Sequence, residues 1–415
     1  MLRSPGPVAT AGEELYAKFT LAAAVLFIGF ELAYFLSLPS LSLLSASIDT
    51  SGSAIGHDFI NSWMGGRSAF SGGPGAWFDA AAYNAALREV TGRSDFAAHY
   101  WSYPPHLVLF VWPLGLLPYV PAYVLWCAAG LALYLLAAWS GGVQRKRMLF
   151  LAVAPGAAVN VFFGQNGFLT AALLIGGLVN LDRRPVLSGI LFGMLTIKPQ
   201  FGLLLPVLLV MIGRWRVIAS AAATAVVLVA VTVIWFGPSV WLDFVHEVMP
   251  QQRGLIVDAG NFGWPMVVSA FVNARRIGLP NDLAWAVQAI FAAGALAMVI
   301  WTFWKKRNPV LSLAVFVTAT FLFSPWMLNY DMVVFGFIVA LLRERTDNTA
   351  ADHVLALAVW VLPLIMMPLG VADIPIAMIV LPAFGGRLIW RLAHDRAQQT
   401  AHRQLSESVR FSLSS

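Results

Sequence analysis

The chain of 415 residues is 59% hydrophobic, and only 11% of its residues are charged. A soluble domain carries about 25% charged residues, so this chain lacks the polar side chains to cover a folded surface in water. These values exclude a water-soluble enzyme and a disordered or fibrous chain. A membrane span needs roughly 20 apolar residues, so the length suffices for about ten spans and their loops.

Positively charged residues gather in short breaks between the apolar runs, which makes the net charge of +6 a topological signal. Such breaks recur at residues 145–147, 182–184, 214–216, 305–307 and 343–345. Cytoplasmic loops are enriched in Lys and Arg, so these breaks are predicted to face the cytoplasm. Nucleic acid is not an expected partner, because the basic residues do not form one continuous face.

The first apolar stretch, residues 19–38, is long enough to span a membrane, and no convincing cleavage site follows it. We interpret it as an anchor with its N-terminus inside, so that the chain reaches the extracytoplasmic side at about residue 39. The first external loop, about residues 39–103, holds two helical stretches around a glycine-rich turn at 71–75. Two short amphipathic helices on the membrane surface are predicted there.

A second large external loop, about residues 237–282, interrupts the apolar segments that follow. These segments are 106–117, 122–139, 148–163, 169–181, 186–197, 201–212, 217–236, 283–304, 310–323, 332–342, 354–368 and 374–390. Residues 1–390 are predicted to form one all-α transmembrane domain with 11–13 transmembrane helices, followed by a charged cytoplasmic tail at 391–415. Lys18 and residues 145–147 are both predicted to be cytoplasmic, so the chain should cross the membrane an even number of times between them. Three apolar segments lie in this stretch. Either one short segment is re-entrant, or residues 145–147 face outward.

Polar residues that are costly near a membrane recur at five places beside apolar segments, and the predicted topology allows all five to face the extracytoplasmic side. They are His57 and Asp58; Tyr103 and His106; Gln165 and Asn166; Lys198; and Asn329, Tyr330 and Asp331. Carboxylates, a lysine and amides that converge at a membrane surface suit a reaction on a polar headgroup with an anionic leaving group.

The order and spacing of several short motifs resemble glycosyltransferase family 87, whose members are polytopic enzymes of the GT-C fold. The motifs are Asp58-Phe59 after the first span, Tyr103-Pro104-Pro105, Leu117-Pro118 with Trp126, Gly164-Gln165-Asn166 and Lys198-Pro199. The resemblance covers about residues 15–345. It differs at Asn329-Tyr330-Asp331, where mannosyltransferase members often carry a His-Tyr pair, and at Asn261-Phe262-Gly263, where an Asn-Gln-Ser is common.

The resemblance implies an inverting transfer of a sugar from a polyprenyl-phosphate carrier to a lipid or glycan acceptor on the extracytoplasmic face. Mannose is the family default, and the acceptor stays open. The expected location is the bacterial inner membrane, in contact with membrane lipids, with a monomer as the expected state. No cofactor is expected. The implied base is an aspartate in the first external loop, and Asp58 is the matching residue.

The chemistry of the leaving group supports a single base. A phosphate ester departs as a stable anion, so one carboxylate can take the acceptor proton without a partner acid. A fixed cation should stabilise the departing phosphate. We therefore assign Asp58 as base and Lys198 as phosphate partner, with Arg67 in reserve. The sugar and acceptor pocket is assigned to His57, Tyr103, His106, Gln165, Asn166, Asn261, Asn329, Tyr330 and Asp331.

Simpler roles remain open for these residues. Asp58 and Asp331 could cap the helices that follow them, and Gln165 with Asn166 could cap the helix from Phe168. Lys198 could extend its side chain to the membrane interface with no further role. The whole arrangement could also belong to a transporter or flippase for a lipid-linked sugar. We predict no metal site. A divalent cation would need two or more converging carboxylates, and Asp58 with Asp331 is the one pair worth testing.

Overall fold

The computed structural model describes residues 7–37, 52–257, 264–305 and 307–412, and over these ranges the regular secondary structure is helical apart from one isolated bridge between Val267 and Leu328. The prediction of an all-α polytopic membrane protein is therefore confirmed. Six of the described helices contain stretches long and apolar enough to cross a membrane. They are α1 (Pro7–Leu36), α5 (Tyr119–Ser140), α11 (Trp215–Phe236), α15 (Asn281–Phe303), α18 (Ala350–Val371) and α19 (Ile376–Ser412).

A seventh candidate span is bent. Helix α6 (Met148–Ala152) and helix α7 (Pro155–Phe163) meet at an angle of 52°. Pro155 opens α7 as its first residue, and a proline at this position cannot donate the backbone hydrogen bond that would continue the preceding helix. The predicted single segment 148–163 is therefore two helices.

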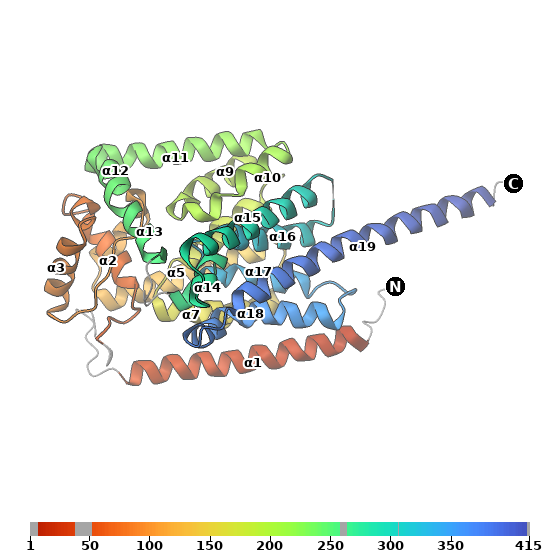
Figure 1. Ribbon diagram of the computed structural model, residues 1–415, viewed down its shortest axis with the longest axis horizontal. Coiled ribbons are helices and arrows are strands. Elements are labelled where there is room, and N and C mark those ends of the chain that lie inside the picture. The colour runs from red at the N-terminus through yellow and green to blue at the C-terminus, as the bar shows by residue number, and fades with distance from the viewer. Residues whose placement is uncertain (1–6, 38–51, 258–263, 306, 413–415) are drawn as a thin grey trace.

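The structure also contains shorter apolar helices. They are α4 (Val108–Val111), α8 (Gly167–Val179), α9 (Pro185–Met194), α10 (Leu205–Met211), α16 (Pro309–Phe323) and α17 (Val334–Leu342). Every residue of α17 and most residues of α16 are buried, whereas the apolar windows of α1 and α11 are only 11% buried. Figure 1 accordingly shows α1 and α11 along opposite outer edges. A helix of 15 residues is shorter than the bilayer core, and protein neighbours on all sides permit this length.

The small helices of the two predicted loops gather at one end of the bundle, which we name the loop end. It contains α2 (Phe59–Ser68), α3 (Ala80–Thr91), α12 (Ser239–Asp243) and α13 (Met249–Val257) (Figure 1). Helix α3 buries one face only, as predicted for a surface helix. Helix α2 differs from that prediction, because every residue in it except Arg67 is buried. The glycines Gly65 and Gly66 let it pack closely against the segment that follows the loop.

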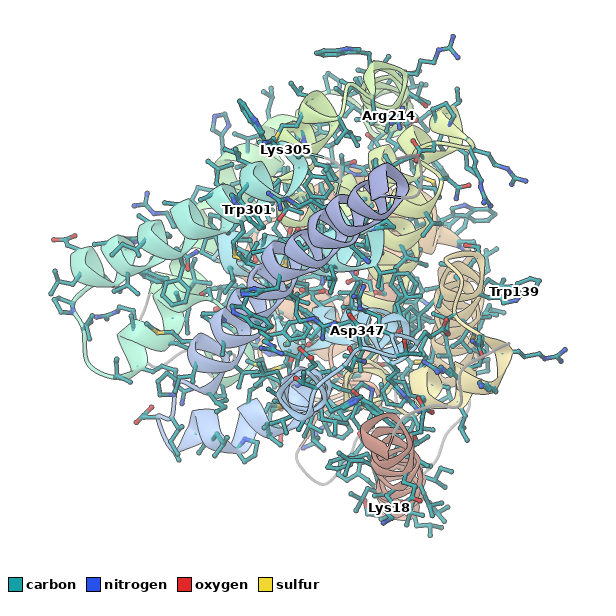
Figure 2. The ribbon with its side chains drawn as sticks, turned by 90° about the vertical axis from the view of Figure 1, so that its right-hand side faces the viewer. Lys18, Trp139, Arg214, Trp301, Lys305 and Asp347 are labelled. Carbon is teal, nitrogen blue, oxygen red and sulfur yellow. The ribbon has the colours of Figure 1, made fainter. Side chains whose placement is uncertain are left out.

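The basic breaks lie at the opposite end, which we name the basic end. Glu13, near the start of α1, pairs with Arg147 at 3.4 Å and with Arg343 at 3.0 Å. Arg214 pairs with Asp182 at the same end. Figure 2 looks onto this end and shows Lys18, Arg214, Lys305 and Asp347 on the face toward the viewer.

The segment Pro105–Leu116, which lies between Lys18 and residue 145, is a short apolar helix. At its far end Gly115 packs on Gly66 of α2, and the carbonyl of Leu117 accepts a hydrogen bond from Trp63 Nε1 at 3.0 Å. The end of the segment therefore lies beside α2, as a re-entrant segment would require. The ion pair between Arg147 and Glu13 places residues 145–147 at the same end as the start of α1.

By length and composition, the described residues hold six helices that could cross a membrane, or seven if the bent pair counts as one span. The six shorter apolar helices fall below that length, so the total of 11–13 transmembrane helices stays a prediction. Helix α19 continues without a break through residue 390, where the sequence suggested a boundary between the last span and the tail.

Candidate functional site

The carboxylate of Asp58 lies at the loop end and is bound by a glutamine. Gln165 Nε2 donates to Asp58 Oδ2 at 2.7 Å, and Tyr103 Oη donates to Gln165 Oε1 at 3.2 Å. Asp58 occupies the N-cap position of α2, but its side chain makes no capping hydrogen bond. Among the described residues, Gln165 is its hydrogen-bonding partner. The carboxylate is therefore not used to stabilise the helix start, which removes the simpler role.

A glycine brings the two segments together. Gly164 ends α7 with φ of +58°, and a Cβ built there would lie 2.4 Å from Phe59 Cβ and 2.9 Å from the carbonyl oxygen of Gly56. A larger residue would be strained in this left-handed conformation and would collide with the start of α2. The sequence Gly-Gln-Asn thus places its glutamine against Asp58 because its glycine permits the backbone contact.

Lys198 is buried at the same end and forms an ion pair with Asp331. Its Nζ lies 2.6 Å from Asp331 Oδ1 and 4.5 Å from the centre of the Tyr330 ring. The second oxygen of Asp331 accepts the backbone N–H of Leu328 at 3.2 Å. Asp331 therefore does act as a local cap, and both of its oxygens are occupied. Lys198 is only 4% exposed, so it does not extend to the interface.

The Asp58 and Lys198 groups belong to one cluster. Asp58 is close enough to Lys198 to interact with it electrostatically. The charges of Asp58 and Asp331 both act on the phenol of Tyr103. The helices are tied together by Asn160 Nδ2, which donates to the carbonyl of Tyr330 at 2.6 Å. Asn160 lies in α7, is fully buried and was not predicted; the signal in the sequence was an asparagine within an apolar segment.

Asn166 lies beside this cluster with its hydrogen-bonding capacity unused. The side chain is 1% exposed, and in the part of the chain that is described neither its amide nitrogen nor its oxygen has a hydrogen-bond partner. It stands at the N-cap of α8 and makes no capping bond. Burial of an unsatisfied amide costs about 1–3 kcal/mol, so this residue is suited to meet a polar group of a ligand.

His106 lies in a neighbouring contact with the second large loop. Its Nε2 lies 3.2 Å from Thr196 Oγ1, and its ring stacks on Trp241 with centroids 5.6 Å apart. Nearby, Gln252 Nε2 donates to Ser102 Oγ at 2.9 Å. Helices α12 and α13 therefore cover the segment that carries Tyr103 and His106. The partners Thr196 and Trp241 were not predicted, because they are distant from His106 along the chain.

The other predicted site residues that the structure describes contact aromatic rings or a backbone carbonyl. The ring of His57 packs 4.6 Å from that of Phe162. Arg67 is exposed at the far end of α2 and lies over the ring of Trp63 at 4.8 Å. Asn329 Nδ2 donates to the carbonyl of Pro363 at 3.0 Å and fixes α18 beside the cluster. Asn261 lies outside the described residues.

A metal centre is not built by the described side chains. No group of three or more His, Cys, Asp and Glu residues stands close enough among them to hold an ion. Asp58 and Asp331 do share Lys198 as an electrostatic neighbour. The lysine already neutralises Asp331, so the pair differs from the converging carboxylates that a divalent cation prefers.

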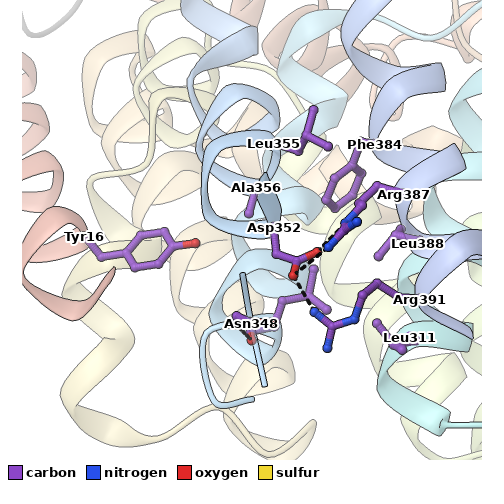
Figure 3. Close-up of a pocket in the computed structure, with 11 residues that line it drawn as sticks. Tyr16, Leu311, Asn348, Asp352, Leu355, Ala356, Phe384, Arg387, Leu388 and Arg391 are labelled. Atoms are coloured by element: carbon purple, nitrogen blue, oxygen red, sulfur yellow. Dashed lines mark hydrogen bonds and ion pairs between the residues drawn. The ribbon is translucent and has the colours of Figure 1, made fainter. Parts of the chain in front are cut away.

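A pocket at the basic end contains charged residues that are already paired. It is lined by Asp352, Arg387 and Arg391 with the aliphatic side chains of Leu355 and Leu388. Figure 3 shows both arginines directed at the carboxylate of Asp352. These contacts join α18 to α19, and the pocket is separate from the cluster around Asp58.

Comparison with known proteins agrees with the geometry. The family model of glycosyltransferase family 87 matches residues 101–325, more than half of the chain. No curated protein matches the chain, and no solved structure does. The match includes Tyr103, Gln165 and Lys198; Asp58 and Asp331 lie outside it and are brought to these residues by the fold. The chain is a membrane protein of glycosyltransferase family 87.

Proposed function

We propose that the protein transfers a hexose from a polyprenyl-phosphate carrier to a hydroxyl group of a lipid or glycan acceptor, with inversion at the sugar carbon. Asp58 serves as the general base in this reaction. Mannose is the proposed sugar. The reaction is proposed to take place on the extracytoplasmic side of the bacterial inner membrane, because the basic breaks share the end opposite to Asp58 and such breaks face the cytoplasm.

The observation that carries this proposal is the state of the Asp58 carboxylate. One oxygen is held by Gln165, and the side chain is only partly buried at the start of α2. A carboxylate that neither caps a helix nor forms an ion pair in the described part of the chain keeps an oxygen available for an acceptor proton. Because the carrier phosphate leaves as an anion, one such base is enough.

Lys198 is the proposed partner of the carrier phosphate. Its charge is shared with Asp331 at 2.6 Å, so the phosphate oxygen would accept a second hydrogen bond from the same ammonium group. An ammonium group offers three donors, and a preorganised donor in a site that excludes water stabilises developing negative charge strongly. Arg67, the reserve candidate, is exposed away from this pair and is a weaker proposal.

The test compares two aspartates of the same loop. Asp79 caps α3 by accepting the backbone N–H of Ala82 at 2.7 Å and is exposed. We expect Asp58→Asn to lower the rate of transfer by roughly 10²–10⁴-fold, the usual contribution of a general base. Asp79→Asn, which keeps an oxygen for the cap, should leave the rate within about twofold.

The measurement is the release of free polyprenyl phosphate together with glycosylated product, by purified protein in detergent. Donors that carry mannose, arabinose or an acidic sugar would be supplied in parallel, with lipid and glycan acceptors. Undiminished transfer by Asp58→Asn would eliminate the base assignment. A preference for a donor other than mannose would overturn the sugar assignment and leave the base assignment intact.

A further inference from the structure

The hydrogen bonds around Asp58 assign a definite direction to a chain of three side chains. A carboxylate can only accept, so the Gln165 amide must present its nitrogen to Asp58 Oδ2, at 2.7 Å. The amide oxygen then faces Tyr103 Oη at 3.2 Å, and the phenol donates to it. The reverse orientation of the amide would set two acceptor oxygens against each other.

Tyr103 is suited to act as the donor at the start of this chain. It is 8% exposed, and Trp101 Nε1 donates to its carbonyl oxygen at 2.6 Å, which fixes the backbone. Burial raises the pKa of the Tyr103 phenol, and the nearby charges of Asp58 and Asp331 raise it further. The phenol therefore keeps its proton throughout the physiological pH range.

The backbone on both sides of Asp58 and Gln165 is held by side chains of α5. Tyr119 Oη donates to the carbonyl of Ile55 at 2.6 Å, and Trp126 Nε1 donates to the carbonyl of Gly164 at 3.0 Å. The two carbonyls lie just before Asp58 and Gln165 in the chain. One helix thus fixes the separation of the two segments, which is the condition for precise placement of a reactive group.

We propose, on the basis of the proposed function, that Gln165 and Tyr103 are positioning residues that hold Oδ2 of Asp58 and thereby present Oδ1 to the acceptor hydroxyl. This replaces the sugar-binding role that the sequence suggested for both. The proton of the acceptor passes to Oδ1 as the acceptor oxygen bonds to the sugar carbon and the carrier phosphate leaves with the electrons of the broken bond. Gln165 and Tyr103 keep their protons during this step.

The charged and titratable groups around Asp58 come from several elements. Those that interact with it electrostatically are Tyr83 of α3, Tyr103, Tyr119 of α5, Lys198 and Tyr330. The Gln165 variants described below leave all of these groups unchanged, and only Tyr103→Phe replaces one of them. A change in pH dependence between Gln165 variants therefore reports on the hydrogen bond to Asp58.

The first test replaces Gln165 in two ways and measures kcat, KM and the pH profile of transfer. Gln165→Leu removes a hydrogen bond that favours the charged carboxylate, so the acid limb of kcat/KM should move to higher pH. The value of kcat should fall by about 10²-fold with little change in KM, as expected for a misplaced catalytic group. Gln165→Glu can donate to Asp58 only when protonated, so its activity should be confined to low pH.

The second test uses the tyrosine and a double variant. Tyr103→Phe should lower kcat about fivefold, the value of one neutral hydrogen bond. In the Gln165→Leu background the same change should have no further effect, because the chain is already broken. Loss of the wild-type elution profile on size exclusion would show a folding defect, and the Gln165→Glu profile decides the question if Gln165→Leu shows one.

The outcomes separate this inference from the function on which it rests. If Asp58→Asn abolishes transfer but the Gln165 variants raise KM alone, with unchanged pH profiles, then Gln165 binds substrate and the positioning role is wrong. If Asp58→Asn remains active, the base assignment itself fails. Shifted pH profiles of opposite sense in Gln165→Leu and Gln165→Glu support the positioning role.

Discussion

Two aspartates at opposite ends of the bundle are used in opposite ways. At the basic end, Asp352 accepts from Arg387 Nε at 2.8 Å, from the Thr349 backbone N–H at 2.7 Å and from Arg391. At the loop end, Asp58 accepts from Gln165 at 2.7 Å and leaves its other oxygen without a partner among the described residues. The comparison separates a carboxylate that holds helices together from one that is available for chemistry.

The same contrast applies to the polar groups around the two aspartates. At the basic end, ion pairs between arginines and carboxylates join α1 to Arg343 after α17, and α18 to α19. The loop end keeps the amide of Asn166 buried and unsatisfied in the described part of the chain. A buried polar group without a hydrogen bond lowers the stability of the folded state. Proteins keep such groups at sites that bind ligands or carry out a reaction.

The largest expected effect on stability comes from breaking the Lys198–Asp331 ion pair at the loop end. Lys198→Met leaves a carboxylate buried without a cation, so the free energy of unfolding should fall by about 3–5 kcal/mol. Lys198→Met combined with Asp331→Asn should recover most of that stability, because the amide oxygen can still accept the Leu328 N–H. Transfer should stay low in the double variant if Lys198 binds the carrier phosphate.

Thermal unfolding in detergent measures the stability of these variants. The control is Arg93→Met, which breaks an exposed ion pair with Asp95 and should have little effect. Full transfer activity in the stable double variant would remove Lys198 from the reaction and leave it a structural role.

A smaller effect is expected at the basic end. Asp352→Asn loses its charge but keeps an oxygen for the Thr349 N–H, and Asp352 is partly exposed. The free energy of unfolding should fall by about 1–2 kcal/mol, while kcat per folded molecule stays the same. A drop in kcat without a loss of stability would show that the two ends are coupled, and the contrast between the aspartates would then be incomplete.

The smallest effect concerns metal ions. Addition of a chelator such as EDTA should leave transfer unchanged, because the proposed reaction needs one carboxylate and a fixed ammonium group. Atomic absorption on the purified protein provides an independent measurement. Loss of activity on chelation, restored by a divalent cation, would contradict the single-base mechanism and would direct attention to Asp58 and Asp331 as shared ligands.

Composition and hydropathy were sufficient to predict an all-α membrane protein and the positions of most helices. Long apolar runs can satisfy their backbone in lipid only as helices, and the breaks between them carry charge or glycine. The apolar segment 106–117 was counted among the spans, and in the structure Pro105–Leu116 is a short helix whose end packs against α2. No property of the segment alone distinguishes such packing from contact with lipid.

The motifs around Asp58, Gln165 and Lys198 identified which residues to compare, since polar side chains beside apolar segments are costly unless they have a use. Their partners could not be derived in this way. Gln165 binds Asp58 across 107 positions of the chain, and Lys198 meets Asp331 across 133. Hydrogen bonds and ion pairs depend on distances of a few ångströms, and only the packing of α5, α7 and α9 around the loop end sets those distances.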